Sequence, residues 1–206
     1  MTLAKLIKGA IGGGVLLSLA SVSAVSAASI PSLFSTGVDG AGNALAPGAL
    51  DPHYVVVGTG NNAVTISSLP FNYVANNATS MWIWEQPSGQ PTWTTRTLRT
   101  TFDLTGFDLS TTSIKGRWAA DDFLDDILIN GVSIGPIPNY PGDENFNSLH
   151  PFTISSGFAT GINTLDFVVR DTGNVAGFRV DFTPVPEPSA VLGLVLLGFG
   201  AFLKRR

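Results

Sequence analysis

The 206-residue chain contains no cysteine and only two histidines. Without cysteine it can form no disulfide, thiol nucleophile or thiolate metal ligand, so its stability must come from a hydrophobic core. His53 and His150 are isolated, each beside a proline, and they do not have the spacing of a metal-ligating pair. No serine lies in a nucleophile-elbow motif. We therefore expect a protein that is not an enzyme, with a secreted hydrolase as the least supported alternative.

The central part of the chain also lacks any useful stretch with a helical period of 3.6 residues. Short runs of β-branched and aromatic residues alternate there with glycine- and asparagine-rich turns, and Asn130-Gly131 is a strong two-residue hairpin signal. The clearest predicted strands are His53–Gly58, Ser80–Glu85, Thr92–Asp103, Asn163–Arg170 and Gly177–Thr183. This pattern predicts an all-β fold over residues 29–184, a single β-sandwich of the jelly-roll type.

Basic residues are scarce in this central part. It has six lysines and arginines against fourteen aspartates and glutamates, which gives a formal net charge of −8. The value of −4 for the whole chain is less negative because five of the eleven basic residues lie near the two ends. Nucleic-acid binding needs clustered positive charge, so nucleic acid is excluded as a partner.

Residues 1–28 have the composition of a signal peptide. Lys5 and Lys8 give a positive start, Gly9–Ala20 is apolar, and Ser21–Ala28 consists mostly of small residues. We expect passage through the Sec translocon and cleavage by signal peptidase after Ala27 or Ala28. An uncleaved membrane anchor is the alternative.

Residues 185–206 combine three features in a fixed order. The motif Pro186-Glu187-Pro188-Ser189 is followed by the apolar stretch Ala190–Leu203 and then by Lys204-Arg205-Arg206. Prolines favour a stiff extended segment, and terminal cations stay on the cytoplasmic side of a membrane. Fourteen helical residues span ~21 Å against a hydrocarbon core of ~30 Å, and the basic side chains can extend that reach. We predict a short transmembrane helix over 190–203, while a buried core helix of the same length is the alternative.

This C-terminal order resembles the PEP-CTERM sorting signal of Gram-negative bacteria. The resemblance implies that the chain is an exosortase substrate, held transiently in the inner membrane by 190–203 with Lys204, Arg205 and Arg206 as its stop signal. Processing would occur at or near the motif Pro186, Glu187, Pro188 and Ser189. The mature protein would then reach the cell surface or the extracellular medium.

The central domain resembles a galactose-binding-like or carbohydrate-binding-module jelly roll over about eighty residues. The residues that carry this resemblance are Thr101–Leu104, Gly116–Asp121, Ile129–Gly131 and Gly161–Val169. Such relatives often have Asp-Asn where this chain has Asp121-Asp122. For the whole chain we expect a non-catalytic structural or adhesive protein of the cell surface or extracellular matrix. The alternative is a carbohydrate-binding module that recognises an extracellular polysaccharide.

The acidic cluster Asp121, Asp122, Asp125 and Asp126 is a candidate calcium site, and calcium is the one cofactor that the sequence suggests. Calcium takes six to eight oxygen ligands, and carboxylates on a short loop supply several of them. The alternative is a solvated turn in which aspartate side chains accept hydrogen bonds from nearby backbone amides.

Aromatic side chains are candidates for stacking on a sugar ring, namely Trp82, Trp84, Trp93 and Tyr140. The alternative is that such large rings fill the core. We expect Trp118 and one of the pair Trp82 and Trp84 to be in the core. Tyr140, in a polar loop, is expected to be exposed.

Overall fold

The computed structural model describes residues 30–182, which fold almost entirely as β-structure. Ten strands form one antiparallel sheet in the order β7-β6-β9-β4-β1-β2-β3-β10-β5-β8. They are β1 Leu50–Val56, β2 Asn62–Thr65, β3 Ile83–Trp84, β4 Thr95–Asp103, β5 Ile114–Asp121, β6 Phe123–Ile129, β7 Val132–Ser133, β8 His150–Ile154, β9 Ile162–Arg170 and β10 Gly177–Asp181, with one short helix, α1 Glu144–Asn147. The predicted all-β class is therefore confirmed.

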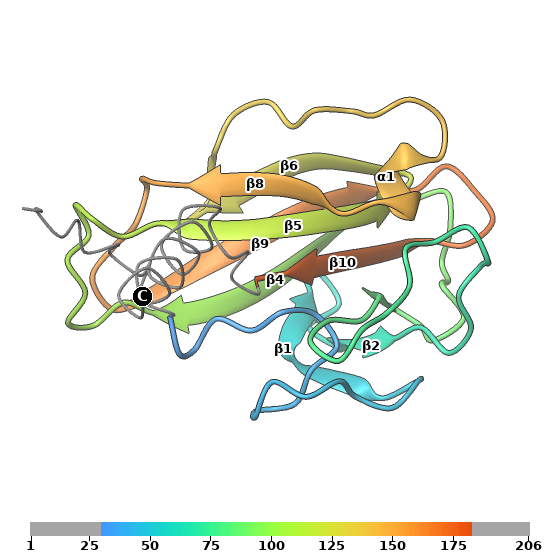
Figure 1. Cartoon of the computed structure of the whole chain (residues 1–206), viewed down its shortest axis with the longest axis horizontal. Helices are drawn as coiled ribbons and strands as arrows, with labels where there is room; N and C mark the ends of the chain where they lie inside the picture. Colours follow the sequence, from blue (N-terminus) through green and yellow to red (C-terminus); the bar gives the residue numbers. More distant parts are fainter. Residues whose placement is uncertain (1–29, 183–206) are drawn as a thin grey trace, which may run out of the picture.

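The sheet curls so that its two ends face each other. Strands β8, β5 and β10 lie over β6, β9 and β4 (Figure 1). Phe167 of β9 lies 4.7 Å from Phe178 of β10 and 6.0 Å from Phe152 of β8, measured between ring centroids. These contacts join strands from opposite ends of the strand order, so the core lies between them.

The sequence of Thr92–Asp103 alternates with a period of two, with Leu98, Thr100 and Phe102 on one face, and the structure agrees with this pattern. Leu98, Thr100 and Phe102 of β4 are buried on one face, and the alternate residues of this strand are more exposed. In β9, Leu165 and Phe167 are also buried, and Asp166 between them is buried on the other face. Both strands are held in a long continuous antiparallel register with each other.

The predicted hairpin at Asn130-Gly131 connects β6 and β7. Both residues have positive φ, 52° and 79°, which is the conformation required by the tight turn that joins two right-twisted strands. The Asn130 side chain contributes further, because its amide nitrogen donates to the backbone oxygen of Gly157 and to Oδ1 of Asn163.

The segment Asp121–Asp126 is mostly strand, whereas the sequence suggested a turn or short loop. Strand β5 continues to Asp121 and β6 already begins at Phe123. The reason is the inward-facing Leu124, which is fully buried and whose strand pairs with β9 through an irregular register between Leu124 and Asp126. Hydrophobic burial thus extends the sheet through a run of acidic residues.

Strand β10 is buried on both faces. Phe178 and Val180 face the core, and Arg179 on the opposite face is also fully buried. The Arg179 guanidinium donates to Oγ of Ser80 at 2.8 and 2.9 Å and to the backbone oxygen of Ala75. An arginine whose donors are bonded to protein acceptors can be buried at modest cost.

Two predicted segments, the signal peptide at 1–28 and the sorting signal at 185–206, lie outside the described residues. Within residues 30–182, no helix is long and apolar enough to cross a membrane. The short transmembrane helix expected at 190–203 therefore stays a prediction.

Candidate functional site

Three carboxylates meet where β5 passes into β6 and where β9 ends. Asp121 is the last residue of β5, Asp122 follows it, and Asp171 follows β9. One carboxylate oxygen of each residue lies within 4.8 Å of the other two. Asp121 and Asp171 are buried, with 7% and 2% of their surface exposed, and Asp122 is half-buried. We call these three residues the aspartate cluster.

Sheet pairing brings these residues together. Strands β6 and β9 are antiparallel neighbours, and Phe123 at the start of β6 lies opposite Arg170 at the end of β9. The backbone amide of Asp122 donates to the carbonyl oxygen of Arg170 at 3.1 Å. Since Asp122 precedes Phe123 and Asp171 follows Arg170, the same pairing places both aspartates at one end of the sheet.

Backbone amides hold one oxygen of two members of the cluster. Oδ2 of Asp171 accepts from the amide of Trp93 at 2.6 Å and from that of Gly173 at 3.0 Å. Oδ2 of Asp122 accepts from the amide and the hydroxyl of Thr172, each at 2.6 Å. The other oxygen of Asp171, Oδ1, is buried and has no hydrogen-bond partner among the described residues.

Asp121 accepts a hydrogen bond from the phenol hydroxyl of Tyr73. The hydroxyl of Tyr73 forms a short hydrogen bond to Oδ2 of Asp121 and lies 2.9 Å from the carbonyl oxygen of Val175. Burial raises the pKa of Asp121 to about 8; the adjacent Asp122 carboxyl adds to this rise, and the Tyr73 hydroxyl opposes it. Burial and the charge of Asp121 also raise the pKa of Tyr73.

Burial has the same effect on Asp171. It raises the pKa of the Asp171 carboxyl above the ordinary value, while the backbone amides of Trp93 and Gly173 oppose the rise. The cluster therefore concentrates negative charge where water solvates it poorly, which makes proton or cation uptake favourable.

Only part of the predicted calcium set belongs to this cluster. Asp121 and Asp122 are members, whereas Asp125 makes a two-pronged ion pair with Arg170 at 2.8 and 2.9 Å. Asp126 instead accepts from Oγ of Ser133 at 2.7 Å. The third member of the cluster is Asp171, which lies about fifty residues further along the chain, and neither Asp125 nor Asp126 belongs to it. The sequence clue that could have indicated Asp171 is its position directly after a predicted strand.

Two of the four candidate sugar-stacking residues are corrected by the structure. Trp82 and Trp84 both lie in the core with no exposed surface, so neither ring can contact a sugar. Their indole nitrogens donate to backbone oxygens, Trp82 to Val74 at 2.8 Å and Trp84 to Pro91 at 3.0 Å. The burial is possible because these backbone acceptors satisfy both polar groups. Trp118 is buried, as expected.

Tyr140 is half-buried rather than freely exposed. Its ring stacks on His150 with centroids 3.7 Å apart and lies 6.2 Å from Trp118. This packing covers one face of the phenol ring. His150 also has its Nε2 atom 2.7 Å from the carbonyl oxygen of Glu144, and His53 stacks on Phe34 at 3.8 Å. Both histidines thus serve packing.

Trp93 remains as a candidate sugar platform. It is 76% exposed, and its backbone has a positive φ of 55°. Its amide is held by Asp171, and its indole ring lies against Gly173, where an added Cβ would be only 3.0 Å from the ring. The exposed indole therefore sits beside the aspartate cluster and is held by one of its members.

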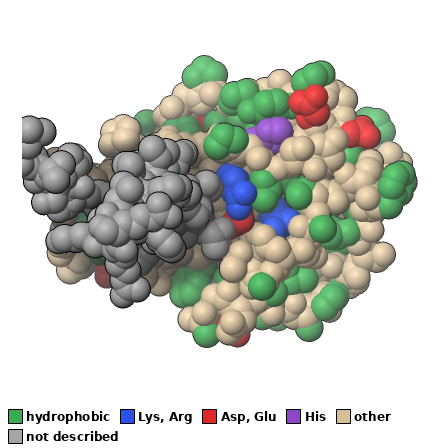
Figure 2. Space-filling view, viewed as in Figure 1, with side chains coloured by type: hydrophobic (Ala, Val, Ile, Leu, Met, Phe, Trp, Pro, Cys, Tyr) green, Lys and Arg blue, Asp and Glu red, His purple; other side chains and the backbone are tan. Residues whose placement is uncertain are grey.

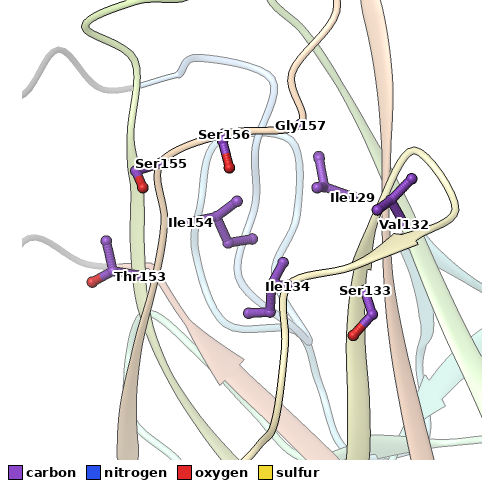
Figure 3. A pocket seen from close by; sticks show the side chains of 9 residues that line it. All are labelled: Ile129, Val132, Ser133, Ile134, Thr153, Ile154, Ser155, Ser156 and Gly157. Atoms are coloured by element: carbon purple, nitrogen blue, oxygen red, sulfur yellow. The ribbon is translucent and has the colours of Figure 1, made fainter.

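A small hollow of about 160 Å³ lies elsewhere on the domain. It is lined by the β6–β7 hairpin, with Ile129 and Val132, and by the segment Thr153–Gly157 (Figure 3). Small-molecule sites usually have ~300–1,000 Å³ and a few convergent polar or charged groups, so this hollow is smaller than a usual small-molecule site.

On the visible part of the surface, hydrophobic side chains are scattered rather than gathered into one broad patch (Figure 2).

A comparison with protein-family models gives no match for this chain, and a comparison with curated proteins gives none either.

Proposed function

We propose that this chain is an exported, non-catalytic β-sandwich protein that serves as a structural or adhesive component of the cell surface or extracellular matrix. The observation that carries the proposal is the ordered C-terminal sequence. Pro-Glu-Pro, an apolar stretch and three basic residues follow within twenty-five residues of the last strand, β10. The facing ends of the curled sheet support a sandwich of the jelly-roll type.

The delivery route has three steps. The signal peptide directs the chain through the Sec translocon, and the apolar stretch then holds it in the inner membrane. An exosortase cuts near Pro186-Glu187-Pro188 and releases the body. Among residues 30–182, the hydrophobic core extends from Tyr54 to Val180 and lies within the ten-stranded sheet.

A structural or adhesive role for the body fits its surface and its chemistry. With a formal charge of −8 it repels other anionic macromolecules unless cations bridge them. The histidines are occupied in packing, and the hollow of about 160 Å³ is lined by apolar and hydroxyl side chains. These features give no support to hydrolysis, which needs an activated nucleophile or a pair of opposed carboxylates.

The test is mass spectrometry of the full chain, expressed in a Gram-negative host with and without an exosortase. We expect the host with exosortase to release a protein that lacks residues 190–206. Replacing both Pro186 and Pro188 by alanine should leave the uncut protein in the membrane. Pro184→Ala, a nearby proline outside the motif, is the matched control and should be processed normally. Recovery of released wild-type protein with its C-terminal residues intact would contradict the sorting assignment.

A second candidate function, recognition of an extracellular polysaccharide, is favoured by the exposure of Trp93. An exposed indole offers a flat apolar face for a sugar ring. Retention of the protein on exopolysaccharide should then be saturable and should fall at least tenfold in Trp93→Ala. Phe71→Ala, which removes another fully exposed ring, is the control. Equal retention of the wild type and Trp93→Ala would refute a sugar site at this residue.

A further inference from the structure

We propose that Asp121, Asp122 and Asp171 form a binding site for a divalent cation, and that calcium is the cation whose ligand chemistry it fits best. This site differs from the one expected from the sequence, because Asp171 replaces Asp125 and Asp126. It does not depend on the proposed export or adhesive function.

The first argument is convergence. Two chain segments about fifty residues apart place one oxygen from each of the three carboxylates within 4.8 Å of one another. The neighbouring aspartates show what happens where such convergence is absent. Asp125 is neutralised by Arg170, and Asp126 is bonded to Ser133. Within residues 30–182, the groups that donate hydrogen bonds to the cluster are amides and hydroxyls, and none is a cationic side chain.

The second argument is independent of the clustering. Asp171 is 98% buried, and its Oδ1 atom has no hydrogen-bond partner among the residues described. Buried polar atoms are nearly always hydrogen-bonded, so an unpartnered oxygen on a carboxylate that belongs to this cluster indicates a missing partner. Since a carboxylate oxygen accepts but does not donate, that partner must be a cation or a proton donor.

The third argument concerns rigidity. Oδ2 of Asp171 is fixed by the amides of Trp93 and Gly173, and Oδ2 of Asp122 by Thr172. Such bonds fix the direction of the two carboxylates, as outer-shell partners do around metal ligands. Each of these bonds uses Oδ2 only. Oδ1 of Asp171 is thereby fixed in position while it accepts no hydrogen bond from the described residues.

The ligand type selects the cation. The cluster offers carboxylate oxygens alone, and the chain has no cysteine, so soft metals that prefer sulfur are disfavoured. Calcium accepts six to eight oxygens in flexible geometry, whereas magnesium demands a near-ideal octahedron. Asp122 is only half-buried, so its side of the cluster gives the ion access from solvent and leaves room for water ligands.

The experiment uses the full chain in mild detergent, stripped with chelator and then titrated with calcium chloride by calorimetry and thermal melting. We expect one saturable site per chain. The melting temperature should rise by about 5–10 °C when calcium is at a hundred times its dissociation constant. Magnesium at the same concentration should give a much smaller rise. Equal binding of the two ions would overturn the assignment to calcium.

Substitutions then locate the site. Asp171→Asn retains an oxygen for the amides of Trp93 and Gly173 but loses a charged ligand, so calcium affinity should fall at least thirtyfold. Asp122→Asn, on the solvent side, gives the same test in a position that folding tolerates more easily. Asp126→Asn is the matched control, because it removes one negative charge nearby without touching the cluster.

The alternative is that the three carboxylates only share protons. In that case the chelated protein would show no calcium-dependent heat or melting shift up to millimolar concentrations, and the proposal would be overturned. The same conclusion would follow if Asp126→Asn lost calcium binding while Asp171→Asn and Asp122→Asn both kept it.

Discussion

Replacing Asp121 by asparagine should change how the stability of this protein depends on pH when no divalent cation is present. In the unfolded chain Asp121 loses its proton near the ordinary pKa of 3.8, whereas in the folded protein burial raises that pKa to about 8. Folding therefore takes up a proton between these values. Below pH ~4 the carboxyl is protonated in both states, and its full contribution to stability is present. This contribution declines as the pH rises and is lost above pH ~8.

The size of the effect follows from the width of this window. It covers about four pH units, each corresponding to ~1.4 kcal/mol, so the upper limit is about 6 kcal/mol. Asp121 also interacts with Asp122 and with the Tyr73 hydroxyl, so the free energy that depends on its own ionisation is smaller than this limit. We therefore expect a decline in the free energy of unfolding of about 2–3 kcal/mol between pH 4 and 8 from this residue.

Asparagine imitates the protonated carboxyl, because it is neutral and keeps an oxygen for the Tyr73 hydroxyl. Urea unfolding in chelator, followed by tryptophan fluorescence at several pH values, compares the two proteins. Asp121→Asn should match the wild type near pH 4 and exceed it by about 2–3 kcal/mol above pH 8. Asp126→Asn is the control and should show no such divergence. A difference between Asp121→Asn and the wild type that stays constant from pH 4 to 9 would refute the reasoning.

Three further substitutions test packing and polar contacts, with urea unfolding as the measurement in each case. The buried amide of Asn163 makes four hydrogen bonds of 2.7–2.8 Å to the chain around it, so Asn163→Ala should cost about 2–4 kcal/mol; a loss below 1 kcal/mol would show that water replaces the amide. A Cβ on Gly116 would lie 2.6 Å from the ring of Phe152, so Gly116→Ala should cost about 1–3 kcal/mol through overpacking, and an unchanged midpoint would contradict this. Arg99 binds the buried Asp166 through two bonds of 2.6 and 2.7 Å, so Arg99→Met should cost about 2 kcal/mol, and adding Asp166→Asn should recover part of it. Full additivity of these two changes would indicate that the ion pair does not matter.

The class of fold was predictable because it rests on local signals. Alternation with a period of two grouped the residues that share one face in β4 and in β9, since neighbouring side chains in a strand point to opposite sides. Asn130-Gly131 predicted its hairpin because these residues tolerate positive φ. The same reasoning was less successful at Asp121–Asp126, where a run of acidic residues suggested a loop and burial of Leu124 produced a strand.

Trp84 of β3 and Trp82, which directly precedes this strand, show another limit of prediction from sequence. The alternating pattern Ser80–Glu85 placed Trp82 and Trp84 on one face, but could not tell whether that face met the core or the solvent. The structure buries both, because backbone oxygens of Val74 and Pro91 are in reach of their indole nitrogens. Trp93, in contrast to Trp82 and Trp84, is exposed to solvent.

By itself, the sequence determined the β-rich composition, the acidic character of the body, and the absence of any disulfide or thiol chemistry, since these depend only on which residues are present and on their local spacing. It also carries the whole basis for the sorting hypothesis. Only the tertiary structure decided which aspartates meet. Asp171 joins Asp121 and Asp122 because β9 pairs with β6 in an antiparallel register, and that pairing is a contact between segments too far apart in the chain for any local pattern to encode.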